Sequence, residues 1–175
     1  MNTGLRRTAA GATVLGAVAV AALVPAAGAS AMPTDFRCTS AQVTTTLTPG
    51  SPGAGQRYAQ VTFTAKPGQS CNFQGSLPVS LAGAPGITVT TESDVANAPL
   101  VTISDGRSAT MLLHWSGIEA PADQVTPTGV TVVAPSTTDP RGVSSDPNIT
   151  LPWNLGAMDN SAQAHNLYVG PVTAA

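Results

Sequence analysis

The stretch Arg57-Tyr58-Ala59-Gln60-Val61-Thr62-Phe63-Thr64-Ala65 decides the fold class of this chain. Its apolar residues alternate with polar or amphipathic ones along the whole stretch. Successive side chains of a β-strand point to opposite faces, so a period of two predicts a strand with one buried face. Ala59, Val61, Phe63 and Ala65 are expected on that buried face.

Similar short apolar stretches recur on both sides of this strand, separated by turn residues. The chain has 17 glycines and 15 prolines, many of them in these gaps. We expect further strands at residues 41–48, 77–81, 87–90, 100–104, 109–115, 129–134 and 167–172. Many short strands joined by Gly and Pro turns predict an all-β fold, an antiparallel sandwich or barrel.

Two turns and one long loop interrupt the pattern. Lys66-Pro67-Gly68-Gln69 is expected to end the quoted strand, and Asp105-Gly106 is typical of a tight hairpin. Residues 135–148, rich in Pro and Asp, are expected to form a long loop at one end of the sandwich. Because loops often carry recognition, this loop and nearby Trp153 are the predicted contact surface.

Residues 1–31 have the three parts of a secretory signal. Arg6 and Arg7 form a basic head, residues 9–24 are apolar and uncharged, and Ala29-Ser30-Ala31 is a small-x-small cleavage site. Residues 32–175 are then the single mature domain, and we expect it to be secreted and extracellular or cell-wall associated. The alternative is a retained membrane anchor. The apolar run falls short of the roughly 20 apolar residues that span a bilayer, so no stable membrane insertion is expected after cleavage.

The two cysteines, Cys38 and Cys71, are expected to form one disulfide, because an exported protein meets an oxidising environment. Closing a loop of about 34 residues stabilises the folded state by ~3.7 kcal/mol in the chain-entropy model. The alternative is a metal-binding or catalytic thiol pair. The sequence does not favour this alternative, because no pair of histidines lies near the cysteines at zinc-site spacing.

Composition limits the possible partners. Charged residues make up only 9% of the chain, and the part after the signal has five basic and nine acidic residues. No basic surface suits nucleic acid. We expect a monomer without a cofactor, whose partner is a protein or a cell-wall component.

Catalytic candidates are few, since His114 and His165 are the only histidines. His114 is expected on the strand face opposite Met111, Leu113 and Trp115, at the surface, and His165 is expected to be exposed. No G-x-S-x-G elbow supports a nucleophile. We predict a non-enzymatic binding or structural module. The alternative is a secreted hydrolase with a site near His114 or His165.

Acidic residues are the remaining candidates, because paired carboxylates can hold Ca²⁺. The candidates are Glu92 with Asp94, Asp139 with Asp146, and Asp159-Asn160-Ser161. An Asp beside Pro commonly forms a turn, and the residues after Asp159 lack the Gly and Glu of a calcium loop. No metal site is therefore expected.

Several blocks of the sequence resemble an exported actinobacterial family catalogued as domain of unknown function 4232. The blocks are Gly53-Ala54-Gly55-Gln56-Arg57-Tyr58-Ala59, Cys71-Asn72-Phe73-Gln74-Gly75, Leu113-His114-Trp115 and Pro171-Val172. The resemblance extends from Cys38 to Val172, although the second cysteine pair that the family often has is missing. It implies an immunoglobulin-like antiparallel β-sandwich at or outside the cell surface, and it implies no activity.

Overall fold

The alternating pattern of the sequence produces strands, as predicted. The structure is a computed structural model that describes residues 37–92, 97–134 and 147–175. Its strands are β1 (Val43–Pro49), β2 (Gln56–Ala65), β3 (Ser70–Gln74), β4 (Val79–Ala82), β5 (Thr88–Thr91), β6 (Leu100–Ser104), β7 (Ser108–Ser116), β8 (Gln124–Val125), β9 (Gly129–Val132), β10 (Ile149–Pro152), β11 (Met158–Asp159) and β12 (Asn166–Ala174). A short 3₁₀ helix, η2 (Pro121–Asp123), precedes β8.

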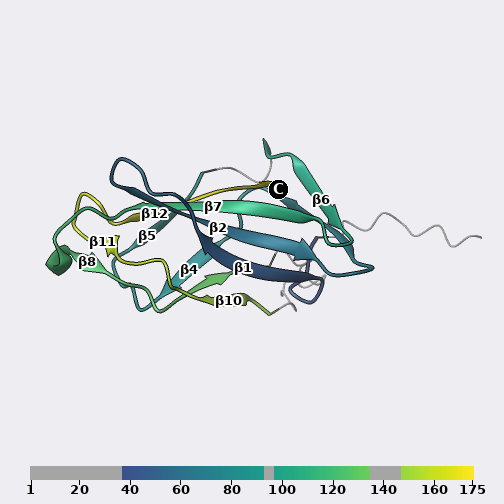
Figure 1. Ribbon diagram of the computed structural model, residues 1–175, viewed down its shortest axis with the longest axis horizontal. Helices are drawn as coiled ribbons and strands as arrows, with labels where there is room; N and C mark the ends of the chain where they lie inside the picture. Colours follow the sequence, from purple (N-terminus) through teal and green to yellow (C-terminus); the bar gives the residue numbers. More distant parts are fainter. Residues whose placement is uncertain (1–36, 93–96, 135–146) are drawn as a thin grey trace, which may run out of the picture. The chain divides into compact units, whose positions relative to one another are not determined.

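The described strands form one large sheet and three small ones (Figure 1). The large sheet has the order β1-β2-β7-β12-β5, and the small sheets are β10-β9-β4, β11-β8 and β3-β6. The β12–β5 pair is parallel, whereas the other strand pairs are antiparallel. The predicted all-β fold with antiparallel sheets is confirmed. Its immunoglobulin-like character stays a prediction.

The inner face of the five-stranded sheet contributes much of the hydrophobic core. Ala59, Val61 and Phe63 of β2 are fully buried, as the alternation predicted. Phe63 packs against Phe73 of β3, with ring centroids 4.8 Å apart, so the large sheet contacts the β3–β6 sheet. Full burial of an aliphatic or aromatic side chain stabilises the fold by about 1.5–3 kcal/mol.

The predicted disulfide between Cys38 and Cys71 is confirmed. The two Cα atoms lie 4.8 Å apart, and both residues are buried. Cys71 belongs to β3, whereas Cys38 precedes β1, so the bond ties the start of the five-stranded sheet to the facing β3–β6 sheet.

The predicted hairpin at Asp105-Gly106 is wrong, although the turn itself exists. The Arg107 N–H donates to the Ser104 carbonyl at 2.9 Å, and Asp105 and Gly106 both have positive φ. The flanking strands lie in different sheets, however, because β6 pairs along its length with β3 while β7 pairs with β2 and β12. The turn therefore connects two sheets.

The prediction of Trp153 as part of a contact surface is also wrong. Trp153 is 7% exposed, and its ring packs on Trp115 with centroids 5.0 Å apart. Its indole N–H donates to the Gly156 carbonyl at 2.8 Å. Burying both the ring and its one polar atom stabilises the core and leaves no surface for a partner.

Three predictions concern segments that lie wholly or largely outside the described residues. They are the secretory signal at 1–31, the loop at 135–148 apart from its last two residues, and the carboxylates of Asp94, Asp139 and Asp146. Within the described ranges, no helix is long and apolar enough to cross a membrane.

Candidate functional site

The outer face of the five-stranded sheet carries polar side chains in rows that run across the strands. Thr62 of β2 lies opposite Thr46 of β1 on one side and Thr110 of β7 on the other, and Thr173 of β12 lies opposite Thr110. All four are exposed or half-buried. The period of two that buries the inner residues therefore presents a continuous row of threonines to solvent.

A second row on this face consists of aromatic rings. The register places Tyr58 of β2 and Tyr168 of β12 opposite His114 of β7, one on each side. The Tyr58 and His114 rings stack at a centroid distance of 5.9 Å, and the His114 and Tyr168 rings at 4.8 Å. We call these three residues the aromatic row. Aromatic pairs of this kind are worth about 0.5–1.5 kcal/mol each, so the row is ordered before any ligand arrives.

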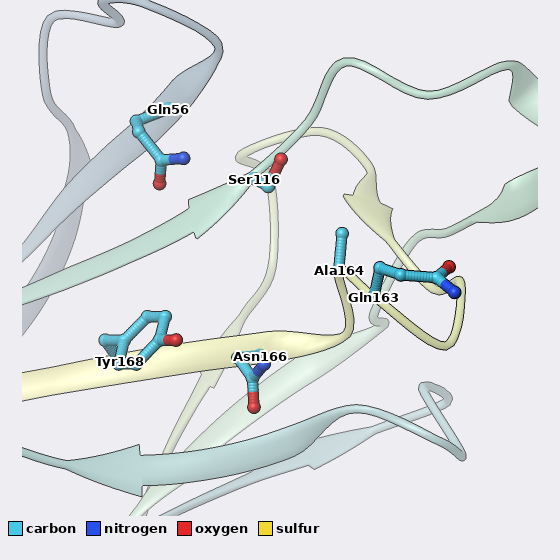
Figure 2. Close-up of a pocket in the computed structure, with 6 residues that line it drawn as sticks. All are labelled: Gln56, Ser116, Gln163, Ala164, Asn166 and Tyr168. Atoms are coloured by element: carbon cyan, nitrogen blue, oxygen red, sulfur yellow. The ribbon is translucent and has the colours of Figure 1, made fainter.

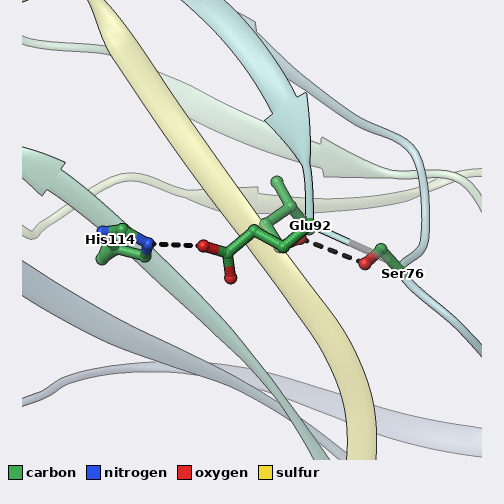
Figure 3. A network of polar contacts seen from close by, with 4 residues as sticks. Ser76, Glu92 and His114 are labelled. Atoms are coloured by element: carbon green, nitrogen blue, oxygen red, sulfur yellow. Dashed lines mark hydrogen bonds and ion pairs between the residues drawn. The ribbon is translucent and has the colours of Figure 1, made fainter. Parts of the chain in front are cut away.

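Glu92 places a carboxylate beside His114, the middle residue of the aromatic row (Figure 3). It follows β5, and its backbone N–H donates to the Val169 carbonyl at 2.9 Å, which continues the parallel pairing with β12. Its Oε1 atom lies 3.0 Å from Nε2 of His114. The His114 side chain is 24% exposed and that of Glu92 is 39% exposed, so the pair is open to solvent.

A shallow cleft lies next to the aromatic row (Figure 2). It has a volume of about 240 Å³ and is lined by Gln56, Ser116, Gln163, Ala164, Asn166 and Tyr168. Gln56 lies opposite Ser116 in the β2–β7 register, and Asn166 begins β12. The Tyr168 hydroxyl points toward Asn166, whereas the Gln163 amide points away from Gln56 (Figure 2). The lining side chains offer amide and hydroxyl groups and carry no charged group.

Asp159 fixes the wall of this cleft that Ser116 forms. It is 2% exposed, and its carboxylate accepts hydrogen bonds from Ser116 Oγ at 2.6 Å, from the backbone N–H groups of Ile118 and Glu119, and from Gln124 Nε2. Burial raises the pKa of this carboxyl, but these hydrogen bonds lower it more, from 3.8 to about 2. Asp159 is thus a structural anion that holds the end of β7 and the hydroxyl of Ser116.

The turn at residues 161–165 supplies the other wall and is fixed by His165. The Ala164 N–H donates to the Ser161 carbonyl, and Nδ1 of His165 lies 2.8 Å from the same oxygen. The Ser161 hydroxyl donates to Glu119 Oε1. His165 is half-buried, which corrects the prediction that it is exposed, because its ring turns inward to bond its own turn.

The two histidines therefore have different surroundings. His114 lies on the outer face opposite the buried Met111, Leu113 and Trp115, as predicted, and its hydrogen-bond partner is Glu92. The partner of His165 is a backbone carbonyl. Neither partner is a nucleophilic hydroxyl, so the described contacts of these histidines do not assemble a Ser-His-carboxylate arrangement.

The acidic residues are spread over the described part of the molecule. Glu92 is at the aromatic row, whereas Asp159 is buried among hydrogen-bond donors at the end of β7. No group of three or more His, Cys, Asp or Glu side chains within the described ranges could hold a metal ion. Asp159, where the sequence resembles the start of a calcium loop, has both carboxylate oxygens occupied by hydrogen-bond donors.

Sequence reasoning missed the aromatic row and the cleft. The period of two predicts that Tyr58 and His114 both face outward, but it does not predict that they are neighbours. That requires the strand order, since β2, β7 and β12 are far apart in the sequence. The cleft adds a turn whose position depends on tertiary hydrogen bonds.

Comparison with known proteins identifies the family of the chain. The family model described as Domain of unknown function (DUF4232) matches residues 38–173, so the chain belongs to this family. No curated protein and no solved structure matches the chain.

Proposed function

We propose that this member of the DUF4232 family is an exported, non-enzymatic binding module of the cell envelope or extracellular space. Its contact surface is the outer face of the five-stranded sheet, around the aromatic row of Tyr58, His114 and Tyr168. Its partner is a cell-wall component or an envelope protein, and it binds as a monomer. Nucleic acid is not a partner, because the part of the chain after the signal has more acidic than basic residues.

The observation that carries this proposal is the aromatic row. Three rings from three strands are stacked on a half-exposed sheet face instead of being buried in the core. Exposed leucine at position 112, on the same face, adds apolar surface beside them. Rigid aromatic side chains give large contact area at little entropic cost, which is why they dominate binding surfaces.

Export is supported by two independent features. Residues 1–31 have the pattern of a secretory signal. The disulfide between Cys38 and Cys71 is a bond that persists in oxidising compartments.

A second candidate is a secreted hydrolase that uses His114. One observation favours it: the carboxylate of Glu92 lies 3.0 Å from the imidazole, as in a base that is oriented by an acid. Against it, the described hydrogen-bond partner of the imidazole is this carboxylate and not a nucleophilic hydroxyl. We therefore rank it below the binding module.

The proposed function is tested by capture on the producing cell's own envelope. Purified protein is mixed with the insoluble envelope fraction, and the bound amount is measured after sedimentation. We expect wild-type protein to sediment with the fraction and the double variant Tyr58→Ser, Tyr168→Ser to lose at least tenfold in affinity. Leu100→Ser, an exposed residue of β6 in another sheet, is the control and keeps wild-type binding.

The same preparation separates the two candidates. Incubation with the envelope fraction should release no soluble fragments, and His114→Ala should change binding without changing any release. Wild-type protein that fails to bind, or that binds equally well without the two tyrosines, contradicts the binding surface. Release of fragments that stops in both His114→Ala and Glu92→Gln supports the hydrolase instead.

A further inference from the structure

We infer that the cleft lined by Gln56, Ser116, Asn166 and Tyr168 holds one uncharged sugar residue of a polysaccharide. The inference rests on the proposed function and names the ligand class. Three kinds of observation carry it: the chemistry of the lining groups, the size and openness of the cleft, and the way its walls are fixed.

The lining groups match a ligand that both donates and accepts hydrogen bonds. A side-chain amide has an acceptor oxygen and two donor hydrogens, and Gln56 and Asn166 each supply one such amide to the cleft, whereas the Gln163 amide points away from Gln56 (Figure 2). The Tyr168 hydroxyl is both donor and acceptor. Ser116 donates its hydrogen to Asp159, so its oxygen can take part in a further hydrogen bond only as an acceptor. Sugar hydroxyls pair with all of these groups.

The absence of charge among the six lining side chains selects against ions. A phosphate or sulfate would need a cationic side chain to replace its hydration, and a cationic ligand would need a carboxylate. Two carboxylates lie near the cleft, Asp159 behind Ser116 and Glu92 beside the aromatic row, and both repel anions. The cleft therefore favours a neutral polyhydroxyl ligand over an acidic one.

Size and openness point to one residue of a longer chain. The volume of about 240 Å³ is below the roughly 300–1,000 Å³ of pockets that enclose drug-sized ligands. The cleft is also open to solvent, so a polymer can enter and leave it on the sheet surface. The aromatic row next to it offers further contact along the same face.

The walls are held in place without a ligand. Asp159 fixes Ser116 on one side, and His165 fixes the turn that carries Gln163 and Ala164 on the other. Preorganised polar groups lower the entropic cost of binding, which a ligand of one sugar ring needs because its contact area is small.

Affinity electrophoresis tests the inference with defined probes. Full-length protein is run in native gels that contain dextran, a mannan or a galactan, and in parallel gels that contain dextran sulfate, the anionic form of the first. We expect at least one neutral polymer to retard the protein and dextran sulfate to leave its mobility unchanged. Gln56→Ala and Asn166→Ala should each weaken that retardation at least tenfold, while Asn97→Ala, an exposed amide just before β6 of another sheet, stays within twofold of wild type.

Each outcome decides for or against the sugar site. If no neutral polymer retards the protein, if dextran sulfate retards it equally, or if Asn97→Ala weakens retardation as much as Gln56→Ala does, the inference is overturned. Thermal melts show whether either variant has lost its fold. If only Asn166→Ala has lost it, the test uses Gln56→Ala. If envelope binding requires the two tyrosines but no neutral polymer retards the protein, the proposed binding module is supported. The sugar site alone is then contradicted.

Discussion

Replacing Asp159 by asparagine removes one negative charge from the wall of the cleft and keeps the shape of the side chain. The wild-type carboxylate accepts hydrogen bonds from Ser116, Ile118, Glu119 and Gln124. An asparagine side chain has one acceptor oxygen, and its NH₂ group would face one of these donors. We therefore expect Asp159→Asn to fold with a clearly lower free energy of unfolding.

The size of the effect follows from the pKa of Asp159. Burial raises this pKa, but the hydrogen bonds lower it by more, so that it falls from 3.8 to about 2. A folded pKa below the unfolded one stabilises the protein above the unfolded pKa, and this contribution is lost as the pH falls through the folded pKa. The charge is then worth about 2 kcal/mol at neutral pH, and about 1 kcal/mol less near pH 3.

Urea unfolding followed by the fluorescence of Trp115 and Trp153 measures this difference. At neutral pH, Asp159→Asn should lose at least about 2 kcal/mol relative to wild type. The gap should shrink by about 1 kcal/mol near pH 3, because the Asp159 carboxyl of the unfolded wild-type chain is then mostly protonated while that of the folded protein is still mostly ionised. Asp123→Asn makes the same change of charge at an exposed site and should stay within about 0.5 kcal/mol of wild type at both pH values.

Two results would refute this reasoning. One is an Asp159→Asn variant as stable as wild type at neutral pH, which would mean that the carboxylate is not held by its donors. The other is a gap that stays constant or widens in acid, which would mean that the pKa of Asp159 is not lowered in the folded state.

Three further predictions concern the disulfide, the core and one glycine. Replacing both Cys38 and Cys71 by alanine should lower Tm by roughly 7–15 °C in calorimetry, since the bond is worth ~3.7 kcal/mol; a variant that melts like oxidised wild type would show that the bond does not constrain the fold. Trp153→Ala should lower the free energy of unfolding in urea by about 3–5 kcal/mol, because the ring is buried against Trp115. A loss below about 1 kcal/mol would indicate that the Trp153 ring is exposed. Gly55→Ala should destabilise the fold by about 1 kcal/mol or more, because Gly55 has φ +81° and a Cβ there would lie 2.7 Å from Ile118. Gly53→Ala is the control, because a Cβ at Gly53 would have no atom within 4 Å. Equal melting temperatures for the two variants would count against the strained turn.

Local signals in the sequence predicted the features that depend on near neighbours. The alternation in residues 57–65 predicted β2 and its buried face, and that face is fully buried from Ala59 to Phe63 at every second residue. The disulfide was predictable because two cysteines allow one pairing. The turns at residues 66–69 and 104–107 were also predictable, since a few residues with special φ preferences determine a turn.

Features that depend on competition between distant segments were not predictable from one sequence. The Asp105-Gly106 turn has the local signature of a hairpin, but β3 competes successfully for β6. Trp153 follows the segment expected to be a loop, and only the position of Trp115 shows that its ring is buried. Asp159 looks like the start of a calcium loop until its donors from β7 and residues 118–124 are known.

The most direct test of the proposed binding surface is hydroxyl-radical footprinting of the protein bound to the envelope fraction, compared with free protein. The account predicts protection of Tyr58, Leu112 and Tyr168 on the outer sheet face, with no change at the exposed Leu100 on β6. Protection of Leu100 with unchanged reactivity at the two tyrosines would contradict it.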